Sequence, residues 1–259
     1  MNRQSTYQIL KKKRLSNQEK EDIQELVKAC CIRECLRLSY SFEPGTSHYL
    51  LYLKQGNGFC LAAAVRVLPY DDTLAECIAF THPDHRRQGY FSVLFDCVLE
   101  DFDETDLLFP VSGQTGDALA VLEHLEAAPQ ATELQMELSL EDTVIPELEQ
   151  TAPELSLVPG VPDQNGELLQ LVGSHDFLLG SCQLSPAGYD CLCLHHVEIS
   201  EAYRGRGYGF AMMSLLLQRL ARENIRRLIL QVSGDNAPAL ALYKKTGFRI
   251  TETLSYYLY

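Results

Sequence analysis

The spacing of apolar residues in the last third of the chain predicts a strand and then a helix. Residues 192–199 form an apolar, partly β-branched run of the kind found in buried strands. Residues 210–221 carry apolar side chains at the period of an α-helix. The segment between them holds two arginines and three glycines within residues 204–209. We therefore expect a strand, a glycine-rich turn and a helix, in that order.

The first half of the chain shows a pattern of the same kind. Ser16 and Glu19 are spaced as a capping box, and the apolar residues after them predict an amphipathic helix. Strands are expected near residues 48–53 and 59–67, joined as a hairpin, and a third strand covers residues 75–80. A turn with arginine and glycine again leads from that strand into a helix.

The two halves repeat each other at a nearly fixed offset. A shift of 118 residues places Arg86 on Arg204 and Gly89 on Gly207, and a shift of 121 relates later residues of the two halves. Self-similarity at a fixed offset indicates a duplicated unit. We therefore expect three segments: a first domain (1–140), an acidic linker (141–165) and a second domain (166–259).

The charged residues restrict the kind of ligand that the chain can bind. The net charge is −13, yet nine Lys and Arg residues occur from Arg204 to Arg249 and none between Arg87 and Arg204. An acidic protein with one basic region is poorly suited to nucleic acid and well suited to a small polyanion. We expect no nucleic-acid partner.

Composition and hydropathy indicate a protein of the cytoplasm. With 259 residues, 46% of them hydrophobic, the chain can form one large or two modest domains. It has no apolar run of about eighteen residues, and its first residues lack the apolar core of a signal peptide. The nine cysteines are odd in number and lie largely within apolar segments, which favours reduced thiols. We expect a cytoplasmic protein with no membrane partner.

A glycine-rich turn before a helix is suited to bind phosphate. The N-terminus of a helix presents unpaired N–H groups and a partial positive charge, and glycines let the backbone approach the anion. A dinucleotide fingerprint would need a small residue in place of Phe210, and a Walker-type loop would need Gly-Lys-Ser/Thr, which does not occur. Neither of these two nucleotide-binding classes is favoured.

Two motifs of the second half resemble those of the GNAT superfamily of N-acetyltransferases. Arg204-x-x-Gly207-x-Gly209 resembles the pyrophosphate-binding motif of that family, and residues 236–248 resemble its Asn-x-x-Ala-x-x-x-Tyr-x-x-x-Gly-Phe motif. The resemblance implies an α/β (α+β) fold of two tandem GNAT-like domains, each with a mixed, mostly antiparallel twisted sheet flanked by helices. It covers nearly the whole chain.

The first half departs from the motifs of the family. Phe91 stands where the motif has Gly or Ala, and Leu122 stands at the place of Tyr243. This half lacks the expected proton donor and most partners for phosphate, so we interpret it as a degenerate, structural or substrate-shaping domain. The linker is also too short for both helices that precede the second strand in the family.

The resemblance implies an acetyl-CoA site in the second half, with no metal. Backbone groups of the strand would bind the pantetheine arm, the turn would bind the pyrophosphate, and the last motif would add two side chains. The implied cofactor-binding residues are Val197, Glu198, Ile199, Arg204, Gly205, Arg206, Gly207, Tyr208, Gly209, Asn236 and Tyr243. Tyr243 is also the expected catalytic acid, because a phenol with a pKa of about 10 can protonate a thiolate.

The catalytic base is expected on the strand before the turn. His195 lies nine residues before Arg204, where some members of the family carry a histidine, and histidine takes up protons near neutral pH. A water chain is the alternative base. Simple alternation along a strand would place His196 and Glu198 on one face and four residues on the other. These four are Cys193, His195, Val197 and Ile199.

These expectations combine into one function and one alternative. The favoured function is an acyltransferase that moves an acetyl group from acetyl-CoA to a primary amine of a small molecule or peptide, with the chemistry in the second half. The alternative is a non-catalytic, regulatory module that binds acyl-CoA or a partner protein. Both a monomer and a homodimer are compatible with the sequence.

Overall fold

Two compact units make up the chain. The computed structural model describes residues 7–34, 38–56, 58–113, 116–143, 155–161, 166–174 and 177–259. The first unit comprises Met1–Ala131 together with Leu254–Tyr259, and the second comprises Thr132–Thr253. In the described part of the chain, no helix is both long enough and apolar enough to cross a membrane.

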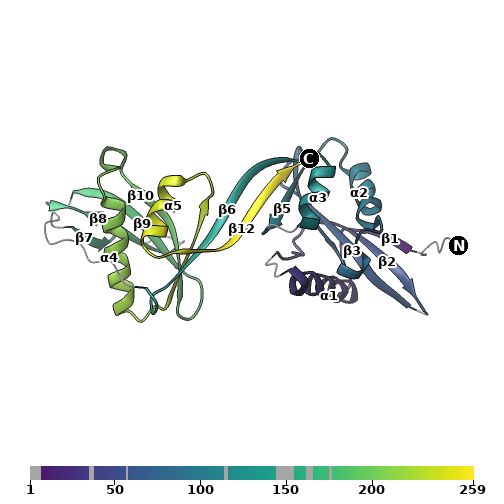
Figure 1. Cartoon of the computed structure of the whole chain (residues 1–259), viewed down its shortest axis with the longest axis horizontal. Coiled ribbons are helices and arrows are strands. Elements are labelled where there is room, and N and C mark those ends of the chain that lie inside the picture. Colours follow the sequence, from purple (N-terminus) through teal and green to yellow (C-terminus); the bar gives the residue numbers. More distant parts are fainter. Residues whose placement is uncertain are drawn as a thin grey trace. The chain divides into compact units, whose positions relative to one another are not determined.

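The first unit is a sheet in the order β1-β2-β3-β4-β5-β12, with helices on both faces (Figure 1). Paired strands run antiparallel, except that β4 and β5 are parallel. Its elements are β1 (Tyr7–Lys12), α1 (Asn17–Glu34), β2 (Ser47–Gln55), β3 (Gly58–Pro69), β4 (Leu74–Thr81), the 3₁₀ turn η1 (Pro83–His85), α2 (Tyr90–Asp101), β5 (Asp106–Ser112), α3 (Gly116–His124) and the end of β12 (Arg249–Leu258).

Helices bury both faces of the first sheet. Leu50 and Leu51 are neighbours on β2 and both are fully buried, yet they belong to different apolar clusters. Successive side chains of a strand point to opposite faces, so an unbroken apolar run fits a strand that is covered on both sides. The helix α1 packs against one face, and α2 and α3 pack against the other (Figure 1).

The second unit has the sheet order β6-β11-β10-β9-β8-β7, and its α-helices α4 and α5 pack into a single apolar cluster. Its elements are β6 (Ala128–Ser139), β7 (Ser156–Pro159), β8 (Glu167–Val172), β9 (Leu178–Pro186), β10 (Cys191–Ile199), the 3₁₀ turn η3 (Glu201–Tyr203), α4 (Tyr208–Arg222), β11 (Arg227–Ser233), α5 (Ala237–Lys245) and the start of β12. Residues 160–166 alone separate β7 from β8, too few for two helices. Within the described residues of this unit, the sheet face opposite α4 and α5 therefore carries no α-helix.

The offsets of the sequence repeat hold in the structure. The 3₁₀ turns η1 and η3 are related by 118 residues, and the helices α3 and α5 by 121. The residues that precede α2 and α4 have nearly the same left-handed conformation, with φ of 82° at Gly89 and 86° at Gly207. These mixed, mostly antiparallel sheets with helices confirm the expected fold class.

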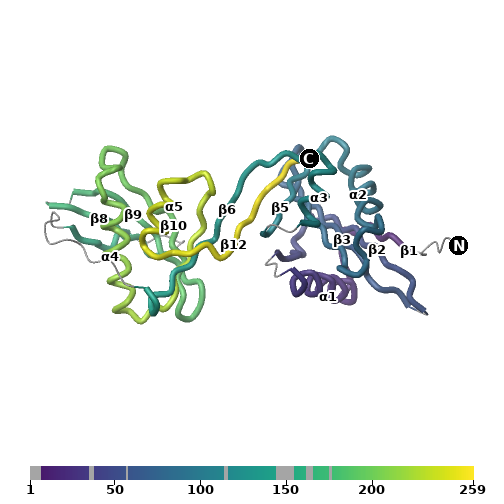
Figure 2. The backbone as a smooth tube through the Cα atoms, in the orientation of Figure 1, coloured from purple at the N-terminus to yellow at the C-terminus, as the bar shows by residue number. Residues whose placement is uncertain are grey.

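Strand pairing divides the chain at other places than composition suggests. We expected the first domain to end at residue 140, but Glu133–Ser139 of β6 pair with β11 in the second unit. Leu254–Leu258 of β12 pair with β5 in the first unit (Figure 2). The reason is that a strand belongs to the sheet that binds its backbone. Of the expected linker, residues 144–154 and 162–165 lie outside the described residues.

A close approach between β9 and β10 accompanies an irregularity in the second sheet. The pairing shifts between His195 and Glu198 of β10, where two residues of β10 face one residue of β9, which is a β-bulge. Gly180 pairs with Ile199 just beyond it. A Cβ atom at Gly180 would lie 2.5 Å from the carbonyl oxygen of Glu198, so the site requires glycine.

We expect the substitution Gly180→Ala to lower the free energy of unfolding by about 1–3 kcal/mol, the usual cost of overpacking a tight contact. Urea unfolding followed by circular dichroism measures this loss. Gly188→Ala is the matched control, because a Cβ atom there would come no closer than 3.5 Å to Cys191 Cβ. Equal unfolding midpoints for the two variants would contradict the close approach at Gly180.

Candidate functional site

The strands β10 and β11 part in the middle of the second sheet. Their parallel pairing runs from Cys191↔Arg227 to Leu194↔Leu230 and ends there. The next residues of β10 form the bulge, in which His196 has a positive φ of 47°. β11 meanwhile stays paired with β6 as far as Ser233. The part of β10 after the bulge, Val197–Ile199, is the segment that the sequence assigned to the cofactor.

The bulge reverses the side-chain alternation expected for β10. Leu194 and Ile199 pack in the same apolar cluster, on one face of the sheet. His195 and Glu198 pair with residues of β9 that are two positions apart and therefore point to the same face. This face is the other one, because His195 directly follows Leu194 along the strand. We expected His195 to share a face with Ile199 and Glu198 to lie on the opposite face from His195. Both expectations were wrong, because His195 shares a face with Glu198 instead. One extra residue in the bulge is the physical reason.

The glycine-rich turn leads directly from the end of β10 to the first turn of α4. Gly205 and Gly207 have positive φ values of 73° and 86°, which glycine adopts without strain. Gly207 is the N-cap of α4, and no described side chain makes a capping hydrogen bond there. The first N–H groups of a helix lack partners within it, so this N-terminus is suited to an anion. The structure thus brings together all of residues 204–209.

Arg204 is fixed at its base and exposed at its tip. Its Nε donates a hydrogen bond to the carbonyl oxygen of Ile199 at 2.9 Å. Its Nη2 lies 3.6 Å from Glu198 Oε1, and the arginine side chain is 59% exposed. Exposed ion pairs of this kind contribute little energy, so the guanidinium can exchange this partner for an anion. Arg206 stacks over the Tyr203 ring at 5.7 Å.

Gly209 has a packing role that the motif alone does not reveal. A Cβ atom at this position would lie 3.3 Å from Leu242 Cδ2 on α5 and 3.8 Å from Ile199 Cγ1 on β10. A larger residue would push these neighbours away from the start of α4. The third glycine therefore keeps the strand, the turn and α5 close together.

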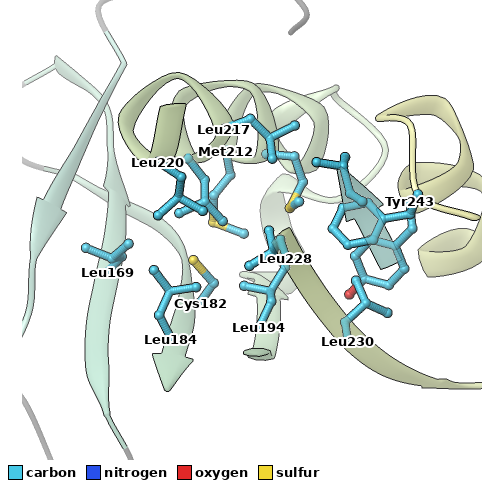
Figure 3. Packing of buried hydrophobic residues seen from close by; sticks show 14 of the residues in the cluster. Leu169, Cys182, Leu184, Leu194, Met212, Leu217, Leu220, Leu228, Leu230 and Tyr243 are labelled. Carbon is cyan, nitrogen blue, oxygen red and sulfur yellow. The ribbon is translucent and has the colours of Figure 1, made fainter. Parts of the chain in front are cut away.

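Tyr243 lies on α5 among apolar residues of both parted strands. It belongs to the cluster that contains Leu194 and Leu230, and it is 6% exposed (Figure 3). Its ring centroid lies 5.6 Å from that of Phe248. Burial raises the pKa of Tyr243 to about 12, with a smaller contribution from Cys182. The phenol therefore stays protonated at any ordinary pH.

Asn236 caps the helix that carries Tyr243. It is the N-cap of α5, and its Oδ1 accepts a hydrogen bond from the N–H of Ala239 at 3.1 Å. This capping contact stabilises the first turn of the helix. A contact with a cofactor would then have to come from the Nδ2 group of the same side chain.

His195 belongs to a polar group of residues on the face opposite α4 and α5. Its Nε2 lies 2.8 Å from Ser185 Oγ, and its Nδ1 lies 3.9 Å from Cys193 Sγ. The neighbouring His196 places its Nδ1 2.9 Å from Gln183 Oε1. Sequence reasoning missed Gln183 and Ser185, although the polar residues that alternate with apolar ones along β9 were a usable signal.

Comparison with known proteins finds a family match that lies almost entirely in the second unit. Residues 131–248 match the model of the acetyltransferase (GNAT) family. Mycothiol acetyltransferase from Corynebacterium glutamicum is 42% identical over 60 residues, which are 23% of this chain and 20% of that relative. The chain thus matches about a fifth of the length of its curated relatives.

Solved structures share the fold over nearly the whole chain. A GCN5-related N-acetyltransferase from Sphaerobacter thermophilus has a TM-score of 0.72 at 16% identity, covering 97% of this chain and 95% of that one. A tandem GNAT protein from the clavulanic acid biosynthesis pathway has a TM-score of 0.63 at 15% identity, covering 98% of each. The chain thus shares its fold with these proteins, and its residues 131–248 match the acetyltransferase (GNAT) family model.

Proposed function

We propose that this protein transfers an acetyl group from acetyl-CoA to a primary amine of a small molecule or peptide, in its second unit. The observation that carries the proposal is the place where β10 and β11 part, directly before the glycine turn and the start of α4. Parted strands offer backbone groups to a pantetheine arm, and the helix N-terminus offers N–H groups to the phosphates. The family match and the acetyltransferase relatives support acetyl transfer.

The turn would hold the coenzyme by its pyrophosphate. Two cationic residues, Arg204 and Arg206, directly precede the first N–H groups of α4 in the chain, and charged hydrogen bonds to phosphate are among the stronger ones. Backbone groups of Val197–Ile199 would bind the arm that leads to the thioester. The proposed set is the one that the sequence indicates: Val197, Glu198, Ile199, Arg204, Gly205, Arg206, Gly207, Tyr208, Gly209, Asn236 and Tyr243.

Tyr243 would supply the proton that the departing thiolate needs. When the amine nitrogen bonds to the acetyl carbon, the carbon–sulfur bond breaks and its electron pair stays on sulfur. Burial raises the pKa of Tyr243 to about 12, so the phenol is protonated whenever the thiolate leaves. Its position among residues of the two parted strands supports this role, because the thioester arm would lie between those strands.

The acceptor amine would approach the face of the second sheet that carries His195. Within the described residues this face has no covering α-helix in its own unit, and its polar side chains suit a polar substrate. The attacking amine must lose a proton, and His195, oriented by Ser185, would take it. A water chain is the alternative base. The relatives named mycothiol acetyltransferase favour a small-molecule acceptor over a peptide.

Acetyl-CoA is expected to bind once per chain. Arg204→Ala should weaken its binding about 10- to 150-fold, because a charged hydrogen bond contributes about 1.5–3 kcal/mol. Arg86→Ala at the matched position of the first unit should leave the affinity unchanged, since Arg86 is already paired with Glu34 and Asp117. Calorimetry measures both. Two equivalent sites per chain, or a loss with Arg86→Ala alone, would contradict the proposal.

Tyr243→Phe should lower turnover about 10²- to 10⁴-fold and leave the affinity for acetyl-CoA unchanged, because it removes a positioned acid and keeps the ring. The wild-type protein should show no alkaline loss of activity from this group below about pH 11, because the acid is lost only as pH rises through its pKa of about 12. Steady-state kinetics with a panel of amines and a free-thiol assay measure both. Full activity in a folded Tyr243→Phe variant would remove this residue from the mechanism.

Two substitutions separate the two roles of Asn236. Asn236→Ala should cost about 1 kcal/mol of stability through the lost cap, whereas Asn236→Asp should keep the cap. If the Nδ2 group binds the coenzyme, both variants bind acetyl-CoA more weakly. Thermal unfolding and calorimetry give the two readouts. Wild-type affinity in Asn236→Asp would limit Asn236 to its capping role.

A further inference from the structure

A cavity of about 380 Å³ lies in the first unit, where β4 and β5 part. Their parallel pairing runs from Leu74↔Asp106 to Glu76↔Leu108, and residues further along both strands line the cavity, together with parts of α1, α2 and α3. The repeat offset of 118 places Glu76 on Leu194, where β10 and β11 part in the second unit. The size is that of a small-molecule site.

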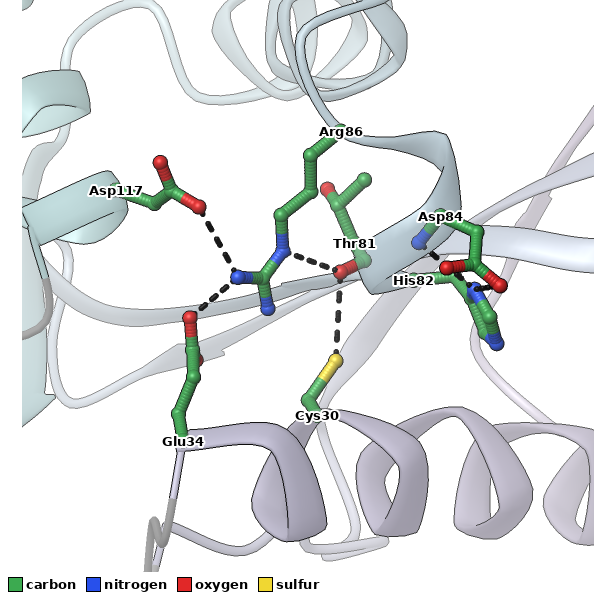
Figure 4. Close-up of polar contacts among 7 residues, drawn as sticks. All are labelled: Cys30, Glu34, Thr81, His82, Asp84, Arg86 and Asp117. Atoms are coloured by element: carbon green, nitrogen blue, oxygen red, sulfur yellow. Dashed lines mark hydrogen bonds and ion pairs between the residues drawn. The ribbon is translucent and has the colours of Figure 1, made fainter.

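Arg86 makes the same backbone hydrogen bond as Arg204, but two carboxylates already compensate its charge. Its Nε donates to the carbonyl oxygen of Thr81 at 3.1 Å, the bond that Arg204 makes to Ile199. The Nη1 of Arg86 is in addition paired with Glu34 and with Asp117, the latter at 3.1 Å (Figure 4). The Arg86 side chain is 19% exposed, against 59% for Arg204.

A phosphate would find no vacant cation at Arg86. Burial alone would lower the pKa of Arg86, and the Glu34 and Asp117 carboxylates more than offset this, so its pKa is raised. Any anion would have to displace a carboxylate that is already bound. Phe91 stands at the place of Gly209, and its ring stacks on Phe95 with centroids 5.4 Å apart. The first unit therefore lacks the exposed cation and the third glycine that suit the second unit to coenzyme A.

The formal charges around the cavity cancel. Its charged lining residues are two carboxylates and two guanidiniums, those of Glu34, Asp117, Arg86 and Arg87. Burial lowers the pKa of His85, which keeps this lining imidazole neutral at pH 7. Removing a charged group from water costs free energy unless an opposite charge receives it. The cavity therefore disfavours a charged ligand of either sign.

The remaining walls are mostly apolar. Burial raises the pKa of both lining thiols, Cys30 and Cys77, so they stay protonated and act as small apolar groups. Most of the other lining side chains are aromatic or aliphatic. They include Phe80, Phe91, Phe109, Val111, Val121 and Leu122.

We propose that this cavity binds an uncharged, largely apolar small molecule with an alkyl or aryl body. Burial of the apolar body supplies the binding energy, at the usual gain per buried CH₂ group. The site lies in the first unit, takes a ligand of a different chemical class from acetyl-CoA, and does not depend on acetyl transfer in the second unit.

Three ligands that differ only in their head group test the charge preference. We expect 1-octanol, titrated at pH 7 into the full chain by calorimetry, to bind at one site. Octylamine and octanoate should bind at least about tenfold more weakly, because Glu34 and Asp117 already pair with Arg86 and the lining as a whole is formally neutral. Binding of octanoate or octylamine as tight as that of 1-octanol would overturn the proposal.

Substitutions that fill the cavity test its location. Ala118→Phe on α3 and Ala79→Leu on β4 both add side-chain volume at lining positions, and each should weaken 1-octanol binding about tenfold. Ala120→Phe, on the exposed side of α3, is the matched control and should leave binding unchanged. Circular dichroism checks that each variant folds. If Ala118→Phe does not fold, 1-octanol binding to Ala79→Leu alone tests the location of the site. Unchanged 1-octanol binding in the folded cavity variants would overturn the proposal.

A double substitution tests why charge is disfavoured. Glu34→Gln with Asp117→Asn leaves Arg86 without its carboxylates, so octanoate should gain affinity about tenfold while 1-octanol binding persists. Acetyl-CoA binding, measured on the same variant, should be unchanged. No gain for octanoate would contradict the compensation argument, whatever the outcome for acetyl transfer in the second unit.

Discussion

The candidate chemistry of the second unit depends on one interruption of backbone hydrogen bonding. A regular parallel ladder between β10 and β11 would satisfy the backbone groups of both strands and leave none for a ligand. Pairing instead ends at Leu194↔Leu230, and the bulge redirects the rest of β10. Two glycines make this arrangement possible, since Gly180 lets β9 stay close to the bulge and Gly209 lets α4 begin beside β10 and α5.

Local features of this fold could be predicted from the sequence, and non-local ones could not. The capping box forms as expected, with the N–H of Ser16 donating to Glu19 Oε2 at 2.7 Å. The glycine turn and α4 also lie where the pattern indicates, because their signals lie within a few residues. The bulge gave no such signal, because its residue with a left-handed backbone conformation is His196 and not a glycine, which would have marked the position. The boundaries of the units escaped prediction because the partner of a strand is chosen by distant residues.

The repeat shows how one backbone design can carry two different sets of side chains at the same turn. Arg87 has a positive φ of 60°, close to the 73° of Gly205 at the matched position, so the turn forms with arginine in place of glycine. Two acidic side chains compensate the charge of Arg86 beside this turn, and Phe91 stands at the place of Gly209 and packs on Phe95. The acidic residues were visible in the sequence, but their approach to Arg86 joins α1 and α3, which no local motif could indicate.

The place of β12 has a consequence for how the protein folds during synthesis. Leu254 pairs with Ser112, so the edge of the first sheet at β5 receives its neighbour only after synthesis has passed residue 254. An unpaired edge strand is a template for pairing with other chains, and closing so long a loop is slow. The sheet of the first unit is therefore completed at this edge only after the second unit has been synthesised. Synthesis from the N-terminus does not produce a complete first unit before the second one begins.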